Sequence, residues 1–254
     1  MLIAITRAVS ASLASCELTW LPREPIDIDK AIAEHHAYER CLADLGARVI
    51  SLPALDSHPD AVFVEDPAIV LDEVAVITTM GCESRRGERE SLAAAIAPFR
   101  PLIHMRDPAM LEGGDVMRVG RQLFVGLSAR TDAAGVEQLA SELASFGYEV
   151  LPIELRGCLH LKSACCCIGE GVVLVNRGWV DTAPFAHYRL IDVAESEPGA
   201  ANALRIGETV VMPDAYPATA GLLRRAGFQV VELEMTELMK AESGVTCSSL
   251  VFRA

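Results

Sequence analysis

Residues Ser243–Leu250 read Ser-Gly-Val-Thr-Cys-Ser-Ser-Leu and lead directly into the last apolar run of the chain, Leu250–Phe252. Cys247 therefore stands where a loop is predicted to meet a strand. A thiol is partly ionised near neutral pH, so a cysteine at such a position needs little help to attack a carbon atom. A single cysteine beside a strand is also typical of a small buried hydrophobic residue, so its role depends on the rest of the chain.

The same arrangement recurs upstream at regular intervals. A polar residue stands at or beside the start of an apolar strand at positions about 42 to 49 residues apart along the numbering. A fixed period of this size, with strand, hairpin and helix in each repeat, indicates a modular array. Five modules closed into a ring would point their equivalent strand ends at one axis. The five recurring residues are Asp66, Asp115, His160, Asn202 and Cys247.

Hairpins and helices are expected to alternate within the repeats. Tight turns at Gly120-Arg121, Gly169-Glu170 and Gly207-Glu208 argue against the competing prediction, a doubly wound sheet, because parallel strands need long crossovers. Strands are expected at 2–6, 48–52, 62–64, 74–79, 116–119, 123–125, 150–153, after 162, and at 171–175, 204–206, 210–212, 229–233 and 250–252. Helices are expected at 29–46, 88–97, between 131 and 147, and at 217–226 and 235–240.

Length and charge narrow the class of protein. The 254 residues are 51% hydrophobic and 22% charged, which is typical of a globular chain. A net charge of -13 argues against nucleic acid or an anionic membrane as partner and is compatible with a cationic substrate. No apolar run approaches the roughly 18 residues of a membrane span, and the first residues do not resemble a signal peptide. We therefore expect a cytoplasmic protein.

The eight cysteines do not form a Cys-x-x-Cys pair, and no secretory context is visible. A disulfide framework is therefore not indicated. Cys165, Cys166 and Cys167 invite a metal hypothesis, but adjacent side chains of a strand point to opposite faces, so at most two share one face. We interpret this run as filler of a buried strand, and we expect neither a metal nor a cofactor.

A thiol, an imidazole, several acids and two arginines in one cavity would suit a narrow range of reactions. Cys247 would attack an electrophilic carbon, and His160 would protonate a leaving group and then activate water. Carboxylates beside a thiol favour a planar, nitrogen-rich cation such as a guanidinium, whose charge would also help the thiol to ionise. Blander interpretations remain open: His160 could be a core histidine, both arginines could be surface residues, and Glu112 could cap its turn.

Several motifs together resemble one known family. They are Phe63-Val-Glu-Asp-Pro67, Glu83-Ser-Arg-Arg-Gly-Glu88, Leu111-Glu-Gly-Gly-Asp115, Gly126-Leu-Ser-Ala-Arg-Thr131, Leu159-His-Leu-Lys-Ser163, Ala201-Asn202 and Gly244-Val-Thr-Cys-Ser248. The combination, which spans 18–252, is similar to the dimethylarginine dimethylaminohydrolases of the guanidine-modifying (amidinotransferase, or pentein) superfamily. The resemblance implies one catalytic domain over 1–254, a five-bladed α/β propeller of ββαβ-like modules. It also implies hydrolysis of methylated arginine to citrulline and a methylamine through a covalent cysteine intermediate.

The resemblance also implies roles for individual residues. Cys247 matches the family nucleophile, His160 the general acid/base and Glu112 the acid that supports the histidine. Ala241 stands where a larger aliphatic residue is usual, and the segment 8–25 resembles a mobile lid. The implied substrate contacts are Asp60, Glu65 and Asp66 for the guanidinium, Arg85 and Arg130 for the carboxylate, and the backbone carbonyls of Leu18 and Ala241 for the α-amino group.

Other functions remain possible from the sequence. A sister enzyme would act on arginine or another guanidino compound, although arginine deiminases usually carry an inserted helical domain that this chain lacks. A ribosome-binding initiation factor shares the propeller without the Cys/His/acid set, so a non-catalytic binding protein is a second alternative. A protein that binds metal through its cysteines is a third. The expected partner is a small-molecule substrate, and the sequence leaves a homodimer open.

Overall fold

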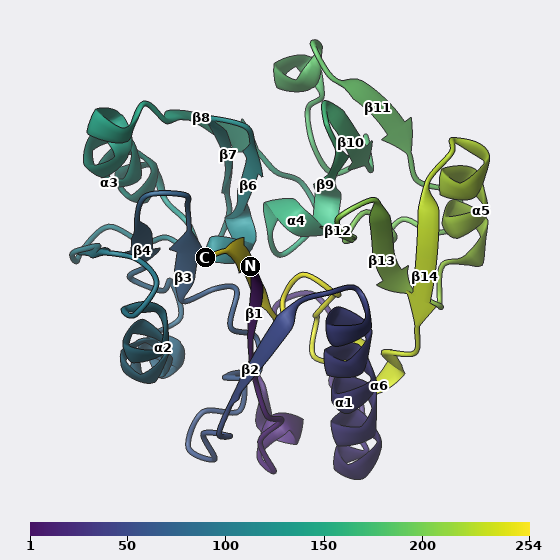
Figure 1. The fold of residues 1–254 in the computed structure, drawn as a ribbon, viewed down its shortest axis with the longest axis horizontal. Helices are drawn as coiled ribbons and strands as arrows, with labels where there is room; N and C mark the ends of the chain where they lie inside the picture. Colours follow the sequence, from purple (N-terminus) through teal and green to yellow (C-terminus); the bar gives the residue numbers. More distant parts are fainter.

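The computed structural model describes residues 1–254 and arranges fifteen strands as five three-stranded sheets around a common centre (Figure 1). This is the ring of modules that the repeat predicted. The sheets are β15 (Leu250–Arg253), β1 (Leu2–Arg7) and β2 (Arg48–Leu52); β3 (Ala68–Val70), β4 (Ala75–Ile77) and β5 (Leu102–His104); β6 (Val116–Val119), β7 (Gln122–Leu127) and β8 (Glu149–Glu154); β9 (Cys165–Gly169), β10 (Val172–Val175) and β11 (Arg189–Asp192); and β12 (Leu204–Ile206), β13 (Thr209–Pro213) and β14 (Gln229–Leu233).

Every sheet follows the same path. In the third sheet, β6 and β7 pair antiparallel across a tight turn, and β7 pairs parallel with β8 after a crossover through α3 (Ala133–Leu143). Gly120 adopts φ 61° in that turn, a conformation that costs glycine little. The hairpins expected at the other two glycine turns are confirmed as well. A single doubly wound sheet, the competing prediction, does not form.

Helices occupy the rim of the ring, where each covers the outside of its module (Figure 1). They are α1 (Ile28–Asp44), α2 (Arg89–Ile96), α3 and α5 (Pro217–Arg225), with the short α4 (Leu161–Ala164) and α6 (Thr236–Met239) elsewhere. Asp27 caps the N-terminus of α1, because its side chain accepts the Lys30 N–H at 3.1 Å. None of the helices combines the length and the apolar composition that crossing a bilayer requires.

The apolar core is divided into clusters that lie between neighbouring sheets. Strand alternation produces this division, because successive side chains of a central strand point to opposite faces. In β7, Leu123 and Val125 join the cluster shared with the second module, whereas Phe124 joins the cluster shared with the fourth. Cys165 and Cys166 likewise fill two different clusters. Each module therefore packs against both of its neighbours.

The two ends of the chain complete one module. The last strand, β15, pairs antiparallel with the first, β1, from Leu2 opposite Arg253 to Ile5 opposite Leu250. The terminal amino group of Met1 donates to the Ala254 carbonyl at 3.2 Å. The ring is therefore closed by a strand pair and not by a covalent link.

Two expectations about strands were wrong. The run 62–64 forms turns instead of a strand, with the Phe63 N–H donated to the Asp60 carbonyl at 2.9 Å. It is apolar because its side chains enter two core clusters near the centre of the ring, and the strand begins only at Ala68. The outer strands β5 and β11 were not expected at all, since each has three or four partly exposed residues without a clear period.

Candidate active site

The loops before the innermost strands converge on one narrow cavity. Asp66, Asp115, His160, Asn202 and Cys247 precede β3, β6, β9, β12 and β15, so closure of the ring brings these distant positions to its centre. Both Cys247 and His160 line the cavity. The other lining residues are Asp60, Asp66, Arg85, Arg130 and Ala241 from the predicted set, and Glu17, Phe63, Leu159, Glu242 and Ser243 beside them.

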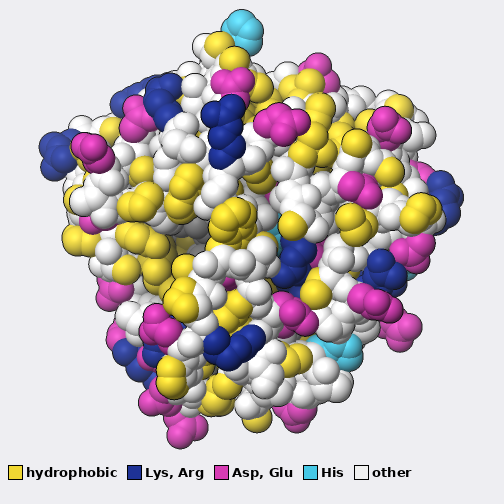
Figure 2. Space-filling view, turned by 180° about the vertical axis from the view of Figure 1, so that it is seen from behind, with side chains coloured by type: hydrophobic (Ala, Val, Ile, Leu, Met, Phe, Trp, Pro, Cys, Tyr) yellow, Lys and Arg dark blue, Asp and Glu magenta, His cyan; other side chains and the backbone are white.

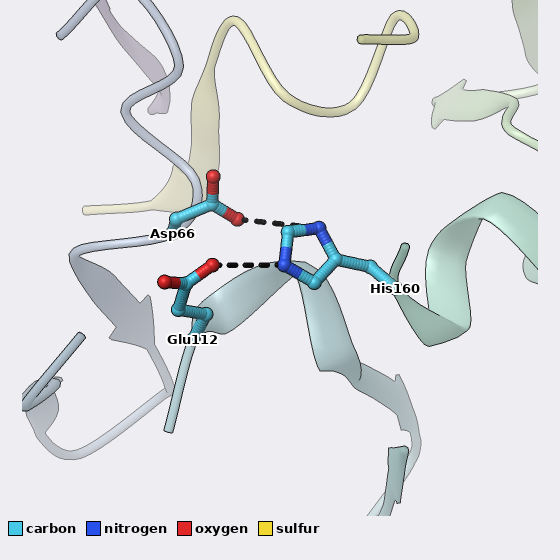
Figure 3. A group of neighbouring side chains, drawn as sticks. All are labelled: Asp66, Glu112 and His160. Atoms are coloured by element: carbon cyan, nitrogen blue, oxygen red, sulfur yellow. Dashed lines mark hydrogen bonds and ion pairs between the residues drawn. The ribbon is translucent and has the colours of Figure 1, made fainter. Parts of the chain in front are cut away.

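His160 lies between two carboxylates (Figure 3). Its Nε2 is 2.9 Å from Glu112 Oε2, and its Nδ1 is 3.9 Å from Asp66 Oδ1. Burial alone would lower the pKa of His160, but the negative charges of Asp66, Asp115 and Glu112 outweigh burial and raise this pKa to about 9. The imidazole therefore carries its proton near neutral pH and can act first as an acid.

The paired glycines before β6 let the backbone pass close to this histidine. A Cβ on Gly114 would lie 2.6 Å from both Asp66 Oδ1 and His160 Nδ1, and one on Gly113 would lie 2.1 Å from the Glu65 carbonyl oxygen. Both distances are far below van der Waals contact. The Gly114 N–H also donates to Asp66 Oδ1 at 3.1 Å. The diglycine is therefore required by close approach and also fixes the Asp66 carboxylate.

Arg85 lies at the cavity wall with its donors already occupied. Its Nε and one terminal nitrogen bind both oxygens of Glu88 at 3.0 and 2.9 Å, and the other terminal nitrogen binds Asp66 Oδ2 at 2.7 Å. Burial alone would raise the pKa of Asp66, but the positive charges of His160 and Arg85 hold it below its ordinary value. Arg85 thus keeps Asp66 ionised and oriented.

Glu112 links the histidine to the second arginine. Its carboxylate is fully buried, with Oε2 on His160 and Oε1 3.5 Å from the Arg130 Nη1. Burial alone would raise the pKa of Glu112, and the hydrogen bond from His160 helps to hold it below its ordinary value. Arg130 also donates through Nη2 to the Thr19 hydroxyl at 3.3 Å, so it contacts both the buried site and the predicted lid.

Cys247 is surrounded mainly by acids. Its sulfur accepts a hydrogen bond from the Gly244 N–H at 3.4 Å. Burial raises the pKa of the thiol, the negative charges of Glu65 and Asp66 raise it further, and Gly244 and Lys162 oppose this only in part. Burial and these acids therefore disfavour the thiolate.

The predicted lid lies across the cavity and is held by two carboxylates. Asp60 accepts the Glu17 N–H at 3.1 Å, and Glu242 accepts the Thr19 N–H at 2.9 Å together with the N–H groups of Trp20 and Leu21. Leu18 lies between these anchors and packs against the neighbouring core cluster, whereas Ala241 lines the cavity itself. These last two positions were expected to supply backbone carbonyls.

Glu65 does not face the cavity that contains Cys247. One carboxylate oxygen lies 2.5 Å from the Lys162 Nζ, and the other accepts the Thr246 hydroxyl at 2.7 Å. Both Glu65 and Lys162 line a separate cavity among the innermost strands. The adjacent acids Glu65 and Asp66 therefore point in different directions, and Glu65 lies behind the thiol instead of beside the expected guanidinium.

The sequence interpretation did not assign roles to several residues that shape the site. Glu88 and Lys162 stand inside the quoted motifs but were not given partners, and Glu242 was not noticed at all. Glu88 pairs with Arg85 three residues away inside the same motif, whereas Lys162 and Glu242 contact distant segments that one sequence does not reveal. Asn202 was recognised as a recurring position but was not assigned a role.

The carboxylates and the imidazole could also suit a cation. One ligand atom from each of Asp66, Glu112 and His160 lies within 4.8 Å of the others, which is close enough for a shared metal ion. In this arrangement the imidazole nitrogens are directed at the two acids instead (Figure 3).

Sequence comparisons point to the family suggested by the motifs. A family model described as "N,N dimethylarginine dimethylhydrolase, eukaryotic" matches residues 19–193. The N(G),N(G)-dimethylarginine dimethylaminohydrolase of Pseudomonas aeruginosa is 36% identical, over 89% of this chain and 90% of its own length. The Streptomyces coelicolor protein of the same name is 35% identical, over 98% of this chain and 96% of its own length.

Solved structures agree in fold. A cysteine-to-serine mutant of the Pseudomonas aeruginosa enzyme, complexed with citrulline, matches with a TM-score of 0.93 and 34% identity over 98% of both chains. A histidine-to-glycine variant of a dimethylarginine dimethylaminohydrolase, in an adduct with S-methyl-L-thiocitrulline, matches with a TM-score of 0.94 and 34% identity. It covers 99% of this chain and 100% of its own. The five-module architecture is therefore shared with these proteins.

Proposed function

Because the chain belongs to the dimethylarginine dimethylaminohydrolase family, we propose that it hydrolyses Nω-methylated L-arginine to L-citrulline and methylamine or dimethylamine. Residues 1–254 would act as one catalytic domain, a dimethylargininase. One observation carries this proposal: the Cys247 thiol and the protonated His160 line the same narrow cavity as the carboxylates of Asp60 and Asp66. A guanidinium is the planar cation that such acids recognise.

Substrate binding follows from the charges around the cavity. Asp60 and Asp66 would hold the guanidinium N–H groups, and the carbonyls of Leu18 and Ala241 would accept from the α-ammonium. Arg130 would bind the substrate carboxylate, since its protein partners are a carboxylate at 3.5 Å and a hydroxyl at 3.3 Å. Arg85 would act mainly by orienting Asp66, because its nitrogens already bind acids at 2.7 to 3.0 Å.

The first half of the reaction uses the thiol and the histidine proton. The bound cation would stabilise the Cys247 thiolate, whose proton leaves to solvent. The sulfur adds to the guanidinium carbon, a C–S bond forms, and the C–N bond to the methylated nitrogen breaks. The leaving amine takes the proton of His160, which becomes neutral. A cationic thiouronium remains attached to Cys247.

The second half reverses the role of the histidine. A water molecule adds to the thiouronium carbon, and neutral His160 accepts one of its protons. The C–S bond breaks, the remaining hydroxyl proton returns to the sulfur, and citrulline is released. Glu112 and Asp66 favour the charged imidazole throughout, which restores the acid for the next turnover.

A substrate comparison tests this function. Citrulline release is measured colorimetrically with asymmetric dimethylarginine, monomethylarginine and arginine at equal concentrations. We expect turnover of the methylated substrates, none in Cys247→Ser, and full turnover in the control Cys41→Ser, whose thiol lies in α1. Turnover of arginine alone would identify a sister guanidine hydrolase instead. Binding without citrulline release from any of the three would point to a non-catalytic propeller.

The net charge of the protein bears on its partners. We propose a cytoplasmic protein whose partner is the small-molecule substrate, without nucleic acid or membrane, because a net charge of -13 repels polyanions. Sedimentation at several protein concentrations tests whether it forms the homodimer that the sequence left open. A retained complex with nucleic acid during purification would contradict the partner assignment.

A further inference from the structure

Asn202 is a recurring residue to which the proposed chemistry gives no role. It occupies in the fifth module the place that Asp66, Asp115, His160 and Cys247 occupy in the others, immediately before the innermost strand. Its side chain is buried, with 7% exposure. A buried amide carries two donors and an acceptor that need partners, so its contacts show what it holds in place.

The amide of Asn202 grips the residue that precedes the nucleophile. Its Oδ1 accepts the Thr246 backbone N–H at 3.0 Å, and its Nδ2 donates to the Thr246 hydroxyl at 3.0 Å. The same Nδ2 donates to the Lys162 carbonyl at 3.2 Å, which fastens the pair to α4 of the fourth module. The Thr246 hydroxyl donates onward to Glu65 at 2.7 Å.

Packing holds one part of this loop, because Val245 is fully buried in a core cluster. A Cβ on Gly244 would lie 2.4 Å from the Asn202 amide, so the loop and the amide are in close contact on one side. On another side, Gly244 and Asn202 line a cavity of about 380 Å³ together with Trp20, Trp179 and other residues. Figure 2 views the face opposite to Figure 1 and shows hydrophobic side chains around a hollow left of centre. The Asn202 hydrogen bonds therefore hold the side of the loop that borders this cavity.

We propose that Asn202 is a positioning residue for the nucleophile: by clamping Thr246 at its backbone and its hydroxyl, it fixes the Gly244–Cys247 turn so that the sulfur faces the catalytic cavity. Within this turn the Gly244 N–H donates to the sulfur, and the Cys247 N–H donates to the Gly244 carbonyl at 3.2 Å. If this turn were mobile, the thiol would lose its fixed orientation. It would also lose the one N–H that helps to stabilise its anion. This inference rests on the proposed chemistry of Cys247.

Two substitutions of Asn202 separate its effect on the orientation of the Cys247 thiol from the effect of charge near that thiol. Asn202→Ala removes the clamp, and we expect kcat to fall about 10–100-fold, because a displacement of about 1 Å can cost that much. KM should change by less than about twofold, since no substrate contact is lost. Asn202→Asp keeps the shape but cannot donate to Thr246 and adds a negative charge. We expect it to move the pH profile of Cys247 alkylation by iodoacetamide to higher pH.

Matched variants exclude a general loss of structure. Asn176 also bridges backbone groups, donating to the Pro198 carbonyl at 2.9 Å and accepting the Gly178 N–H at 2.8 Å, but its side chain does not line the catalytic cavity. Asn176→Ala should leave kcat and alkylation unchanged. Thr246→Ser retains both groups that Asn202 grips and should keep near-normal activity, whereas Thr246→Val should reproduce the loss. Thr246→Val also tests the clamp if Asn202→Ala does not fold.

The measurements are kcat, KM, thermal unfolding and the alkylation rate of Cys247, followed by peptide mass spectrometry because the chain has eight cysteines. The proposal is overturned if folded Asn202→Ala keeps the wild-type kcat and alkylation profile, or if Asn176→Ala loses as much activity. Alkylation does not depend on citrulline release. A wild-type protein without hydrolase activity would therefore refute the function, while the alkylation profiles would still decide the role of Asn202.

Discussion

The proton on His160 couples the charge of the site to the stability of the fold. Its pKa of about 9 lies above the ordinary value of 6.5 for an unfolded histidine. The stabilisation is therefore complete below about pH 6.5 and is lost as the pH rises through about 9. Between these limits we expect the free energy of unfolding to fall by roughly 3 kcal/mol, an upper bound from 1.36 kcal/mol per pKa unit.

Urea unfolding at pH 6.5, 7.5, 8.5 and 9.5 measures this loss. His160→Gln provides the comparison, because it retains a hydrogen-bonding side chain but cannot carry the proton. Cysteines of the unfolded chain also titrate in this range, and their contribution is common to both proteins and cancels in the difference. Parallel pH profiles for the two proteins would show that the histidine is not charged in the folded state.

Sequence alone predicted most of the residues that the structure brings together around the central cavity. The period of the repeat placed Asp66, His160 and Cys247 at equivalent positions, and the ring brings equivalent positions together. It did not predict the direction of a neighbouring side chain. Glu65 precedes Asp66 directly but points to Lys162, because both residues lie in the turn before β3, where no strand alternation predicts side-chain direction. Arg85 was recognised, but its pairing with Glu88 depends on packing that one sequence does not show.

At the scale of elements, the diglycine turn before β6 makes a sharp prediction. Gly114→Ala would place a methyl group 2.6 Å from the facing atoms of Asp66 and His160, so the turn must shift and the imidazole must move. We expect kcat to fall about 100-fold or more, measured as citrulline release. Gly221→Ala in α5 is the control, since its Cβ would meet only the flexible end of Arg225 at 3.3 Å.

The control carries its own expectation. A glycine inside a helix costs roughly 0.5–1 kcal/mol relative to alanine, so Gly221→Ala should raise the melting temperature slightly and leave kcat unchanged. If Gly114→Ala retained normal kcat, the backbone there would not be as tightly held against the histidine as the short distances require.

The lid is a second element whose behaviour depends on one side chain. Glu242 has φ 55°, which is unusual for a residue other than glycine, and its carboxylate accepts three consecutive N–H groups of the lid. Hydrogen bonds to a charged acceptor contribute about 1.5–3 kcal/mol each. Glu242→Gln keeps the shape and removes the charge, so the lid should open more often and KM should rise about tenfold.

Trp20 reports on this movement. In a Trp179→Phe background it is the single tryptophan, and Glu242→Gln should increase its quenching by acrylamide. Glu234→Gln is the control, because this exposed acid pairs with Lys30 away from the lid. Equal quenching and equal KM in all three proteins would show that Glu242 does not hold the lid closed.

Strands were predicted from the sequence only where their residues form a clear apolar run. The inner and middle strands appear as apolar runs, so most of them were predicted. The outer strands β2 and β14 have five residues each and were predicted with their observed bounds. The outer strands β5 and β11 are short and partly exposed, and each forms where a crossover returns the chain beside a middle strand, through α2 for β5 and through a loop with one 3-10 turn for β11. Their residues carry no period that a sequence could reveal.

At the scale of the whole molecule, the two chain ends lie at one of five equivalent junctions, each between an innermost strand and a middle strand. The chain starts with the middle strand β1 and finishes with the innermost strand β15, which pair over four residues. In the third module, β6 and β7 hold the same places and also pair over four residues, but a turn at Gly120-Arg121 joins them. The two chain ends are hydrogen-bonded to each other. If that turn is cut and the ends are joined, the β1–β15 pair becomes covalently linked and the β6–β7 pair closes the ring without a covalent link.

A circular permutant that starts at Arg121 and ends at Gly120, with a short Gly/Ser linker from Ala254 to Met1, should therefore fold and keep kcat within a few-fold. Deleting Leu250–Ala254 should instead unfold the protein, because it opens the ring and removes Leu250 and Phe252 from the core, each worth about 1.5–3 kcal/mol. Circular dichroism, thermal unfolding and citrulline release compare the two. An inactive but folded permutant would show that one particular junction of the ring, and not closure as such, positions the distant catalytic side chains.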